Sequence, residues 1–592
     1  MTDSPAVGRQ SRPLARRLVF IGIPVVLLGF ALVCGWQLLH VASGVLKSQD
    51  QATALRASLE ARDLPRAHED AVQLRGTADD LRDRTDGLVW SLMGWTPGVG
   101  GDLRAIRTAS SGLASVARGA EKVLGVGVAP DGLLRGDRVS LSAVREISTA
   151  TSGMVAGFGE LDRAVDDLSS SPFGPIRSRA ARVADSVTAG HDAVRGAAPV
   201  LEAAPALLGE QGTRNYLLVF QNNAEIRATG GLMGSAAWLT VTDGRLRLER
   251  TFSPIEETNE VEVPFSFTPA ERVLYGDNLA QGAIFVNSMP DFSRVADLLR
   301  QGWGSWFAEP LDGVISLDAV SLSYLLDATG PVEVMGQTLT GDNAVDELLS
   351  GAYSRYPDNE QQDAFFSTVA DTTFDAMTSG RVDGPVLVSA LRRMDQESRL
   401  ALHFFADNLS VANLDPFTPA PDEAGHAIAV GLNNVSGDKM SYYLRSKVAV
   451  TANGCKRGRE SLTGAVQLTS RAPLDATSLP ARVTEVRPET PAIGGVFRQV
   501  PLGSQMVQLV LRAPQGGSIG AVDVDGATVS GARVAQGGLE TVSVEVQLGA
   551  QQSRQVSWQM STGKAQAGDV DVIVTPSIEP TVASFRVPSA CG

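Results

Sequence analysis

The chain has 592 residues, enough for several domains that each bury a hydrophobic core. Its net charge is −15, and outside the first 17 residues the sequence shows no basic patch, which argues against a nucleic-acid-binding surface. The 5 histidines have no metal-binding spacing, and the sequence contains neither a Gly-x-Ser-x-Gly elbow nor a Walker-type loop. These absences argue against a zinc hydrolase and a nucleotide-binding enzyme, and no metal site is predicted.

The first predicted element is a membrane anchor. Residues 18–40 carry no formal charge, and at about 1.5 Å per residue a helix of this length crosses the hydrocarbon core of a bilayer. Four arginines precede this segment, namely Arg9, Arg12, Arg16 and Arg17. Because positive residues stay cytoplasmic, residues 1–17 are predicted to be a cytoplasmic tail and the bulk of the chain to be extracytoplasmic. The alternative is a cleaved signal peptide that ends at Val41-Ala42-Ser43.

Residues 41–205 are predicted to be helical. Apolar residues recur there at steps of three to five among Asp, Glu and Arg, as in Leu64, Ala67, Ala71, Leu74, Ala78 and Leu81. Similar patterns return over 102–125, 138–169 and 176–204. This periodicity indicates an antiparallel bundle or a stalk whose apolar stripe forms a core.

An α/β domain is predicted over residues 206–410. The apolar run at 216–220 is typical of a buried strand, a second run at 236–241 predicts its neighbour, and Asp243-Gly244 predicts a hairpin. Strand and helix then alternate. The expected elements are a helix over 292–303, a strand over 313–317, a helix from its N-cap Asp318 to 328, a strand over 331–334, and two further helices near 342–356 and from 361.

A polar loop is predicted between the first two strands, at residues 221–229. It ends in Gly230 and Gly231, where the backbone can approach a ligand closely. The planar fork of arginine suits phosphate, so this loop and the later helices supply a candidate binding set. Its members are Asn222, Asn223, Glu225, Arg227, Arg355, Gln361 and Asp363. The alternative is a structural turn whose Asn side chains cap their own backbone.

Residues 426–592 are predicted to form a β-sandwich. Short runs of period two are separated there by Gly, Pro, Asn and Asp, after a proline-containing linker over 411–425, and two small sandwiches are the alternative. The chain has 3 cysteines, and Cys34 falls within the predicted anchor. Cys455 and Cys591 therefore remain as the thiols that can form one disulfide in an oxidising compartment.

Four phrases of the sequence resemble a known family. They are NYLLVFQNNAEIRATGGLMGS, LDGVISLDAVSLSYLLDATGPVEV, LTGDNAVDELLSGAYSRYPD with QQDAFF, and GLNNVSGDKMSYYL. They are similar to an actinobacterial family known as domain of unknown function 4012. The resemblance implies a membrane-anchored protein of the cell envelope, associated with exopolysaccharide or surface-polymer assembly.

The α/β domain is also similar, more distantly, to the LytR-CpsA-Psr envelope phosphotransferases. Three segments carry this similarity: 216–241 with Glu225-Ile226-Arg227, 313–334 with Thr329-Gly330-Pro331-Val332, and 339–366 with Arg355 and Gln361-Gln362. The resemblance implies arginines that grip a polyprenyl pyrophosphate and an apolar pocket that holds its lipid. The chain departs from the group at 252–257, where Phe-Ser-Pro-Ile-Glu-Glu replaces a Pro-Arg-Asp motif.

The leading hypothesis is a single-pass envelope protein that binds a polyprenyl-pyrophosphate-linked or polymeric glycan precursor. The first alternative is a phosphotransferase that attaches glycopolymer to the cell wall. Arg227 and Arg355 would then hold the pyrophosphate, and Glu225 or Asp363 would take the acceptor proton or hold Mg²⁺. The second alternative is a non-catalytic structural scaffold. In either ligand-binding hypothesis, Arg227 and Arg355 are expected to converge on one cleft beside apolar walls.

Overall fold

The computed structural model describes residues 14–591 apart from 62, 130–131, 255, 258–262, 264, 277–282, 381, 406–426, 485–498, 537, 565, 567 and 581–583, and it describes side chains from residue 33 onward. The predicted linker over 411–425 and most of the predicted tail over 1–17 lie outside the described residues. The chain divides into two compact units. The first consists of Met1–Gly132 and Ser142–Glu202, and the second of Leu133–Leu141 and Ala203–Gly592.

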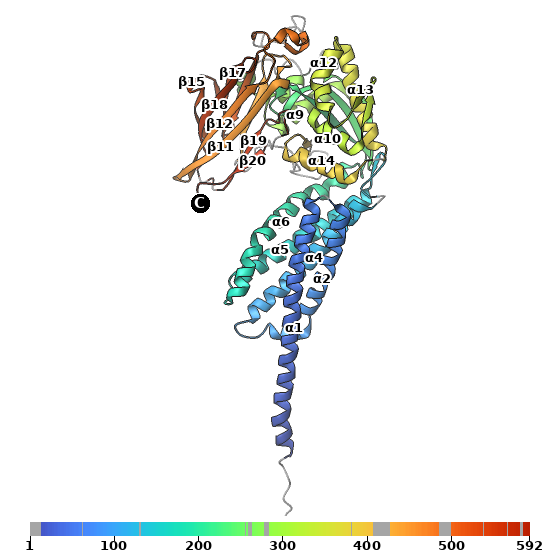
Figure 1. Cartoon of the computed structure of the whole chain (residues 1–592), viewed down its shortest axis with the longest axis vertical. Coiled ribbons are helices and arrows are strands. Elements are labelled where there is room, and N and C mark those ends of the chain that lie inside the picture. Colours follow the sequence, from blue (N-terminus) through green and yellow to red (C-terminus); the bar gives the residue numbers. More distant parts are fainter. Residues whose placement is uncertain are drawn as a thin grey trace, which may run out of the picture. The chain divides into compact units, whose positions relative to one another are not determined.

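The first unit is helical, in agreement with the apolar periodicity (Figure 1). The predicted stripe of α2 is buried at Ala67, Ala71, Leu74, Ala78 and Leu81, and α2 packs against α1 and α4. Asp63 caps α2 by accepting a hydrogen bond from the backbone N–H of Arg66. The helices are α1 (Leu14–Glu60), α2 (Leu64–Thr85), α3 (Leu88–Met93), α4 (Gly100–Val128), α5 (Leu141–Ser169) and α6 (Gly174–Leu207).

The predicted anchor at residues 18–40 falls within α1. None of the helices in the described part of the chain has both the length and the apolar character that membrane crossing requires. The anchor stays a prediction.

A seven-stranded sheet begins the second unit, in the order β1-β2-β5-β4-β3-β6-β9. β3 and β6 are parallel, and the other neighbours are antiparallel. Asp243 and Gly244 have φ of 52° and 78°, as the predicted hairpin turn requires. The strands are β1 (Leu134–Arg135), β2 (Arg138–Val139), β3 (Arg214–Arg227), β4 (Gly230–Thr242), β5 (Arg245–Phe252), β6 (Gly313–Asp318) and β9 (Ala401–Phe404). The short β1–β2 hairpin lies within the predicted helical region over 41–205, between α4 and α5.

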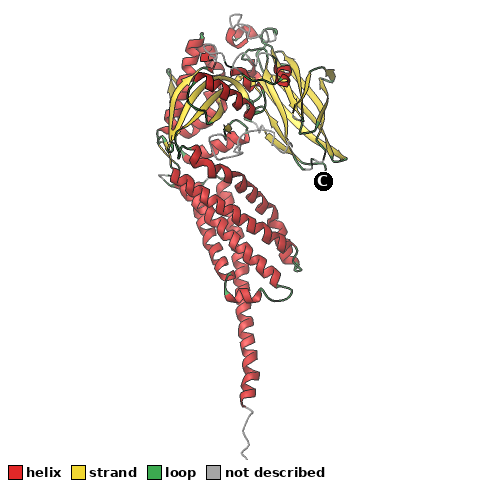
Figure 2. Cartoon of the chain, turned by 180° about the vertical axis from the view of Figure 1, so that it is seen from behind, coloured by secondary structure: helices red, strands yellow, loops and turns green. Residues whose placement is uncertain are grey.

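Helices cover both faces of this sheet, because β3 is apolar on both sides (Figure 2). Leu217 and Val219 share a core with α9 (Phe292–Trp306), whereas Leu218 and Phe220 face α10 (Ala319–Thr329) and α13 (Asn359–Thr378). Asp318 is the N-cap of α10, as predicted. Smaller elements complete the domain: α8 (Pro269–Tyr275), η2 (Ala283–Ser288), β7 (Val332–Val334), β8 (Gln337–Leu339), α11 (Ala344–Asp346), a π-helical turn η3 (Glu347–Gly351), α12 (Ala352–Arg355) and α14 (Gly384–Gln396).

The predicted polar loop at 221–229 is wrong, because β3 continues to Arg227 and β4 begins at Gly230. The ladder between the two strands is interrupted between Asn222 and Ile226 by a bulge, after which Ile226 pairs with Gly231 and Arg227 with Gly230. The polar residues of this stretch are strand residues whose side chains are buried in hydrogen bonds, so their polarity does not indicate a loop.

Two further sheets form the C-terminal part of the second unit. Their orders are β16-β17-β13-β10-β19-β20 and β11-β12-β18-β14-β15, and buried apolar residues from both contribute to a single core. The strands are β10 (Ala427–Asn434), β11 (Leu444–Lys456), β12 (Arg459–Ser470), β13 (Gln505–Arg512), β14 (Ser518–Val524), β15 (Ala527–Val529), β16 (Ala532–Gln536), β17 (Leu539–Leu548), β18 (Ser553–Ser561), β19 (Val570–Val574) and β20 (Ser584–Val587). Because the core is continuous, we call the two sheets together the sandwich.

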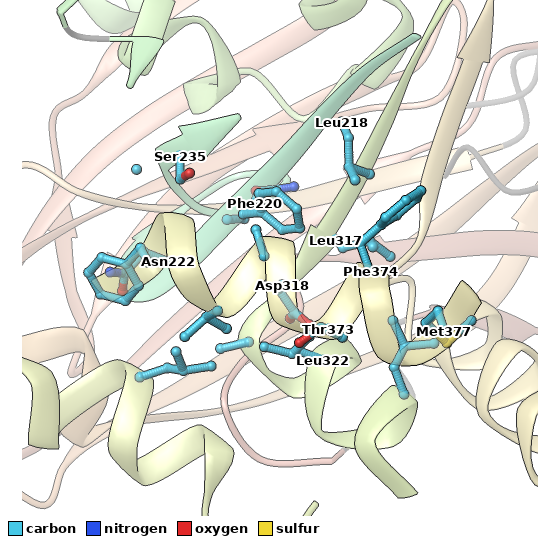
Figure 3. A pocket seen from close by; sticks show the side chains of 18 of the residues that line it. Leu218, Phe220, Asn222, Ser235, Leu317, Asp318, Leu322, Thr373, Phe374 and Met377 are labelled. Carbon is cyan, nitrogen blue, oxygen red and sulfur yellow. The ribbon is translucent and has the colours of Figure 1, made fainter. Parts of the chain in front are cut away.

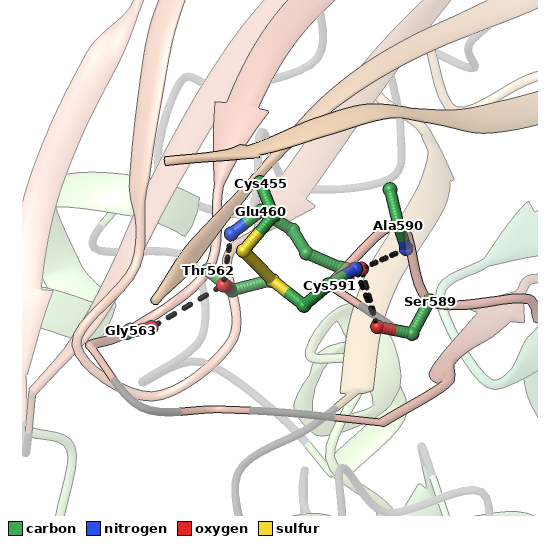
Figure 4. The surroundings of a disulfide bond; sticks show 7 residues. All are labelled: Cys455, Glu460, Thr562, Gly563, Ser589, Ala590 and Cys591. Carbon is green, nitrogen blue, oxygen red and sulfur yellow. Dashed lines mark hydrogen bonds between the residues drawn. A yellow bond between two sulfur atoms is a disulfide. The ribbon is translucent and has the colours of Figure 1, made fainter. Parts of the chain in front are cut away.

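A disulfide joins Cys455, near the end of β11, to Cys591 at the C-terminal end of the described chain (Figure 4). Buried Glu460 reinforces this attachment, because its carboxylate accepts hydrogen bonds from the Ser589 hydroxyl and from the backbone N–H groups of Ala590 and Cys591. The end of the chain is therefore fastened to the sandwich covalently and by hydrogen bonds.

Loss of the disulfide should destabilise the sandwich. Cys455→Ser frees a loop with a sequence separation of 136 residues, and we expect the free energy of unfolding to fall by about 2 to 5 kcal/mol. Urea unfolding of wild type and variant measures the change, and Cys34→Ser is the control because Cys34 is not in a disulfide. Equal unfolding midpoints for Cys455→Ser and the control would contradict a stabilising bond.

Candidate functional site

The tip of the β3–β4 hairpin inserts into the sandwich. Ile226 is part of the sandwich core. The backbone N–H of Ala228 donates to the side-chain oxygen of Asn433 at 2.9 Å, and the Ala228 carbonyl accepts from the Thr575 hydroxyl at 2.8 Å. The stretch that the sequence presented as a ligand-binding loop thus joins the α/β domain to the sandwich.

A buried ion network lies at this junction. Glu225 is 4% exposed and Arg227 is 2% exposed. The Glu225 carboxylate contacts the guanidinium of Arg227 through one oxygen and the Lys439 ammonium through the other. Burial alone would raise the pKa of Glu225, but Lys439 and Arg227 outweigh it and hold that pKa below its usual value. The carboxylate therefore stays ionised between two cations.

The same network reaches the turn that follows β10. Arg227 also donates to the backbone carbonyl of Asn434, whose side-chain N–H donates to Asp438 at 2.8 Å. The Asn434 side-chain oxygen accepts from the backbone N–H groups of Ser436 and Gly437. Burial raises the pKa of Asp438 to about 6, although hydrogen bonds from Ser436, Asn434 and Met440 oppose the shift. We call Glu225, Arg227, Asn434, Asp438 and Lys439 the junction network.

Asn223 takes part in a second buried set. Its amide N–H donates to Asp318 at 3.1 Å, and Asp318 also accepts from Arg399 at 2.7 Å while it caps α10. Arg399, whose side chain is fully buried, pairs with Glu397 and donates to the backbone carbonyls of Ser577 and Glu579. Asn223 is thereby fixed as a structural residue. Local sequence patterns give no signal for Arg399, which is a single arginine ahead of a short strand.

The remaining candidates lie around α12 and α13. Asn222 donates to the Tyr353 hydroxyl, and its side-chain oxygen accepts from the backbone N–H of Ala224 at 3.0 Å, which is the self-capping expected of a structural turn. Arg355 pairs with Glu347 at 2.8 Å. Gln361 has an exposed side chain in the first turn of α13.

The pKa of Asp363 is raised. Burial and nearby Glu256 raise this pKa to about 6, although Arg482 lowers it. Asp363 does not contact Glu225 or Arg227 in the described hydrogen bonds and ion pairs. An elevated pKa is compatible with proton transfer, but no partner group completes such a site.

Arg227 and Arg355 do not share an anion partner in the described part of the chain. Arg227 is committed to Glu225 and Asn434, and Arg355 to Glu347. The described contacts therefore do not bring the two arginines onto one anion, as we expected for a pyrophosphate site. The structural interpretation accounts for Asn222, Asn223, Glu225 and Arg227, since each has its own buried partner.

An apolar cavity of about 220 Å³ lies beside β3, between the seven-stranded sheet and helices α10 and α13. Leu218 and Phe220 line it from β3, and Phe374 and Met377 line it from α13 (Figure 3). The walls also include Leu246, Leu317, Leu322, Leu325, Phe366 and Val369. A ligand with an apolar body would fit these walls.

Polar residues are also among those that line the cavity. Ser235 and Thr373 are two of them, and their buried hydroxyl groups make no hydrogen bond (Figure 3). Gln221 and Asn222 also line the cavity, but they are engaged with protein groups. Sequence reasoning missed both hydroxyls, because an isolated Ser or Thr in an apolar segment carries no motif.

Comparison with protein-family models gives a match. Residues 211–353 match the model of a family described as "Protein of unknown function (DUF4012)". The matched segment extends from just before β3 to Tyr353, so it contains the first strands of the cavity wall and α10 but not α13. The search of the curated proteins found no match. The more distant resemblance to the LytR-CpsA-Psr group stays a prediction.

Arg227 and Arg355 should differ sharply in their contribution to the free energy of unfolding. Arg227→Ala leaves the Asn434 carbonyl without its charged donor and removes one of two cations from buried Glu225, so we expect a loss of about 3 to 5 kcal/mol. Arg355→Ala is the matched control. Its ion pair with Glu347 is partly solvated, and we expect a loss of about 0 to 1 kcal/mol. Urea unfolding of both variants measures the difference, and equal losses would contradict the structural role of Arg227.

The raised pKa of Asp438 predicts a pH-dependent stability. The folded protein binds the Asp438 proton with a pKa of about 6, whereas an unfolded Asp has a pKa of about 3.9. Because the folded state binds more protons between these values, the stabilising contribution is present below about pH 4 and is lost as the pH rises through 6.

Asp438→Asn should abolish this dependence. We subtract the free energy of unfolding of wild type from that of Asp438→Asn at each pH. This difference should rise by about 1 to 3 kcal/mol between pH 4 and pH 7. Urea unfolding at a series of pH values measures it. A difference that is constant over this range would show that Asp438 titrates normally.

Proposed function

Residues 211–353 place this chain in the DUF4012 family, and we propose that it binds the apolar chain of a lipid-linked glycan precursor during cell-envelope assembly. The cavity between the sheet and helices α10 and α13 is the proposed lipid site. The observation that carries this proposal is the apolar lining of the cavity, which includes two residues with unpartnered hydroxyl groups.

The apolar walls favour a lipid over a polar metabolite. Leu218, Phe220, Leu317, Leu322 and Phe374 line the cavity and are only partly buried, although they belong to strands and helices of a domain core. Cavities with such linings exclude water and take up apolar molecules. A ligand that covers these side chains would gain roughly 25 cal/mol for each Å² of apolar surface removed from water.

The two hydroxyl groups favour a lipid that carries a polar group. A buried hydroxyl without a hydrogen-bond partner costs roughly 1 to 3 kcal/mol, and a ligand atom that accepts a hydrogen bond recovers this energy. Ser235 lies on β4 and Thr373 on α13, so they approach the cavity from its two walls. A phosphate or hydroxyl near the end of a polyprenyl chain would provide suitable acceptors.

Arg227 is already paired with protein groups, and this favours lipid binding over phosphoryl transfer. A phosphotransferase would use Arg227 and Arg355 on one pyrophosphate, but Arg227 is buried in the junction network and Arg355 is paired with Glu347. The scaffold alternative accounts for the junction network and leaves the cavity unexplained. Envelope location is proposed from the predicted anchor, and the Cys455–Cys591 disulfide supports an oxidising compartment.

Calorimetry with geranylgeranyl phosphate below its micellar concentration tests the lipid site. We expect wild type to bind this probe and Leu322→Trp to bind it at least tenfold more weakly, because the indole fills the cavity. Leu391→Trp is the control, since Leu391 is 41% exposed on α14 and does not line the cavity. Absence of binding by wild type, or equal affinity for Leu322→Trp, would overturn the proposal.

A further inference from the structure

We propose a second ligand site, where Arg512 binds the carboxylate of an acidic sugar such as a uronic acid. The site is a cavity of about 280 Å³ bounded by α8, by Met289, Pro290 and Asp291 ahead of α9, and by β13, β16 and β17 of the sandwich. It shares no lining residue with the apolar cavity. The inference therefore goes beyond the proposed lipid site and does not depend on it.

Arg512 lines this cavity, and one donor edge of its buried guanidinium is unused. It is the last residue of β13, and its side chain is 9% exposed. Only Nη1 has a charged neighbour, the Asp291 carboxylate at 3.5 Å, while Nε and Nη2 have no hydrogen-bond partner. Nε and Nη2 form the edge of the guanidinium whose two N–H groups point in parallel, which is the geometry that binds a carboxylate through both oxygens.

The nearby charged groups do not supply the missing partner. Glu271 is paired with Arg294, at 2.7 Å to Nε and 3.0 Å to Nη2. Asp291 accepts hydrogen bonds from the Ser293 hydroxyl and from the backbone N–H of Arg294, as the N-cap of α9. Glu271 is thus engaged by Arg294, and Asp291 reaches Arg512 only through Nη1. By comparison, Arg227 leaves only Nε without a partner.

The charge balance favours a ligand with a single negative charge. Arg294 and Arg512 are matched by Glu271 and Asp291 among the lining residues. Burial alone would raise the pKa of Asp291, but Arg512 and the hydrogen bonds from Ser293 and the Arg294 backbone together hold that pKa below its usual value, so Asp291 is ionised. A phosphate dianion would meet two carboxylates as well as two cations, whereas a carboxylate adds one charge at the free edge of Arg512.

The other walls suit a sugar ring. Leu274, Tyr275, Met289, Val534 and Leu539 provide apolar surface, and Thr541 adds a hydroxyl group. An apolar wall beside an aromatic ring can cover the C–H face of a pyranose while Arg512 takes its carboxylate. This chemistry assigns the cavity to a uronic acid residue, free or within an acidic glycan.

Calorimetry on the full chain with sodium glucuronate tests the site. We expect wild type to bind glucuronate, to bind inorganic phosphate at least tenfold more weakly, and to show no heat with glucose. Arg512→Gln should weaken glucuronate binding at least tenfold. Arg586→Gln is the matched control, because Arg586 lies in the same six-stranded sheet with a side chain that is 65% exposed, and its affinity should equal that of wild type.

A second variant separates loss of the site from loss of the fold. Val534→Trp keeps Arg512 and places an indole in the cavity from a partly exposed position on β16, so it should retain the thermal unfolding midpoint of wild type and lose glucuronate binding. Three results would each overturn the proposal: no binding of glucuronate by wild type, equal affinity in Arg512→Gln, or glucose binding as tightly as glucuronate. Because the probe has no lipid, none of these results bears on the apolar cavity.

Discussion

The second unit depends on the burial of Glu225 between two cations. Two side chains from different parts of the chain, Arg227 and Lys439, contact one carboxylate that is almost completely shielded from water. Removing a partner from such a cluster leaves an uncompensated buried charge, so these groups are stable only together. The end of β3 and the turn after β10 must therefore form as one arrangement, and this couples the α/β domain to the sandwich. Arg399 makes a second such link, because it joins Asp318 and Glu397 to the carbonyls of Ser577 and Glu579.

One strand serves both the cavity and the junction. The first part of β3 alternates, so that Leu217 and Val219 enter the α9 core while Leu218 and Phe220 line the cavity. After the bulge the same strand enters the sandwich with Ile226. The junction network therefore fixes the end of the strand that also forms a wall of the cavity.

The local sequence pattern was sufficient to predict most of the strands and helices of the second unit. Apolar runs with turn residues at their ends located β4, β6 and β13, and the side chain of Asp318 marked the start of α10. The end of β3 could not be predicted, because a run of Asn, Glu and Arg has the composition of a surface loop. Its side chains are buried through partners that lie far away in the sequence, such as Lys439 for Glu225. No local period encodes such a partner, and the same reason hides Arg399 and Arg512.

The polar residues of the junction have most of their hydrogen-bond partners within the fold, whereas the donors of the two proposed sites do not. Residue type alone pointed to Arg227, yet its carboxylate and carbonyl partners belong to the fold. Arg512 and the hydroxyls of Ser235 and Thr373 have weaker sequence signals, but each lines a cavity with unpartnered donors. A buried donor without an acceptor lowers the stability of the folded state, and a ligand that supplies the acceptor recovers this energy. Under the two proposals the cavities take different partners, an apolar chain with a small polar end in one and a monoanionic sugar in the other.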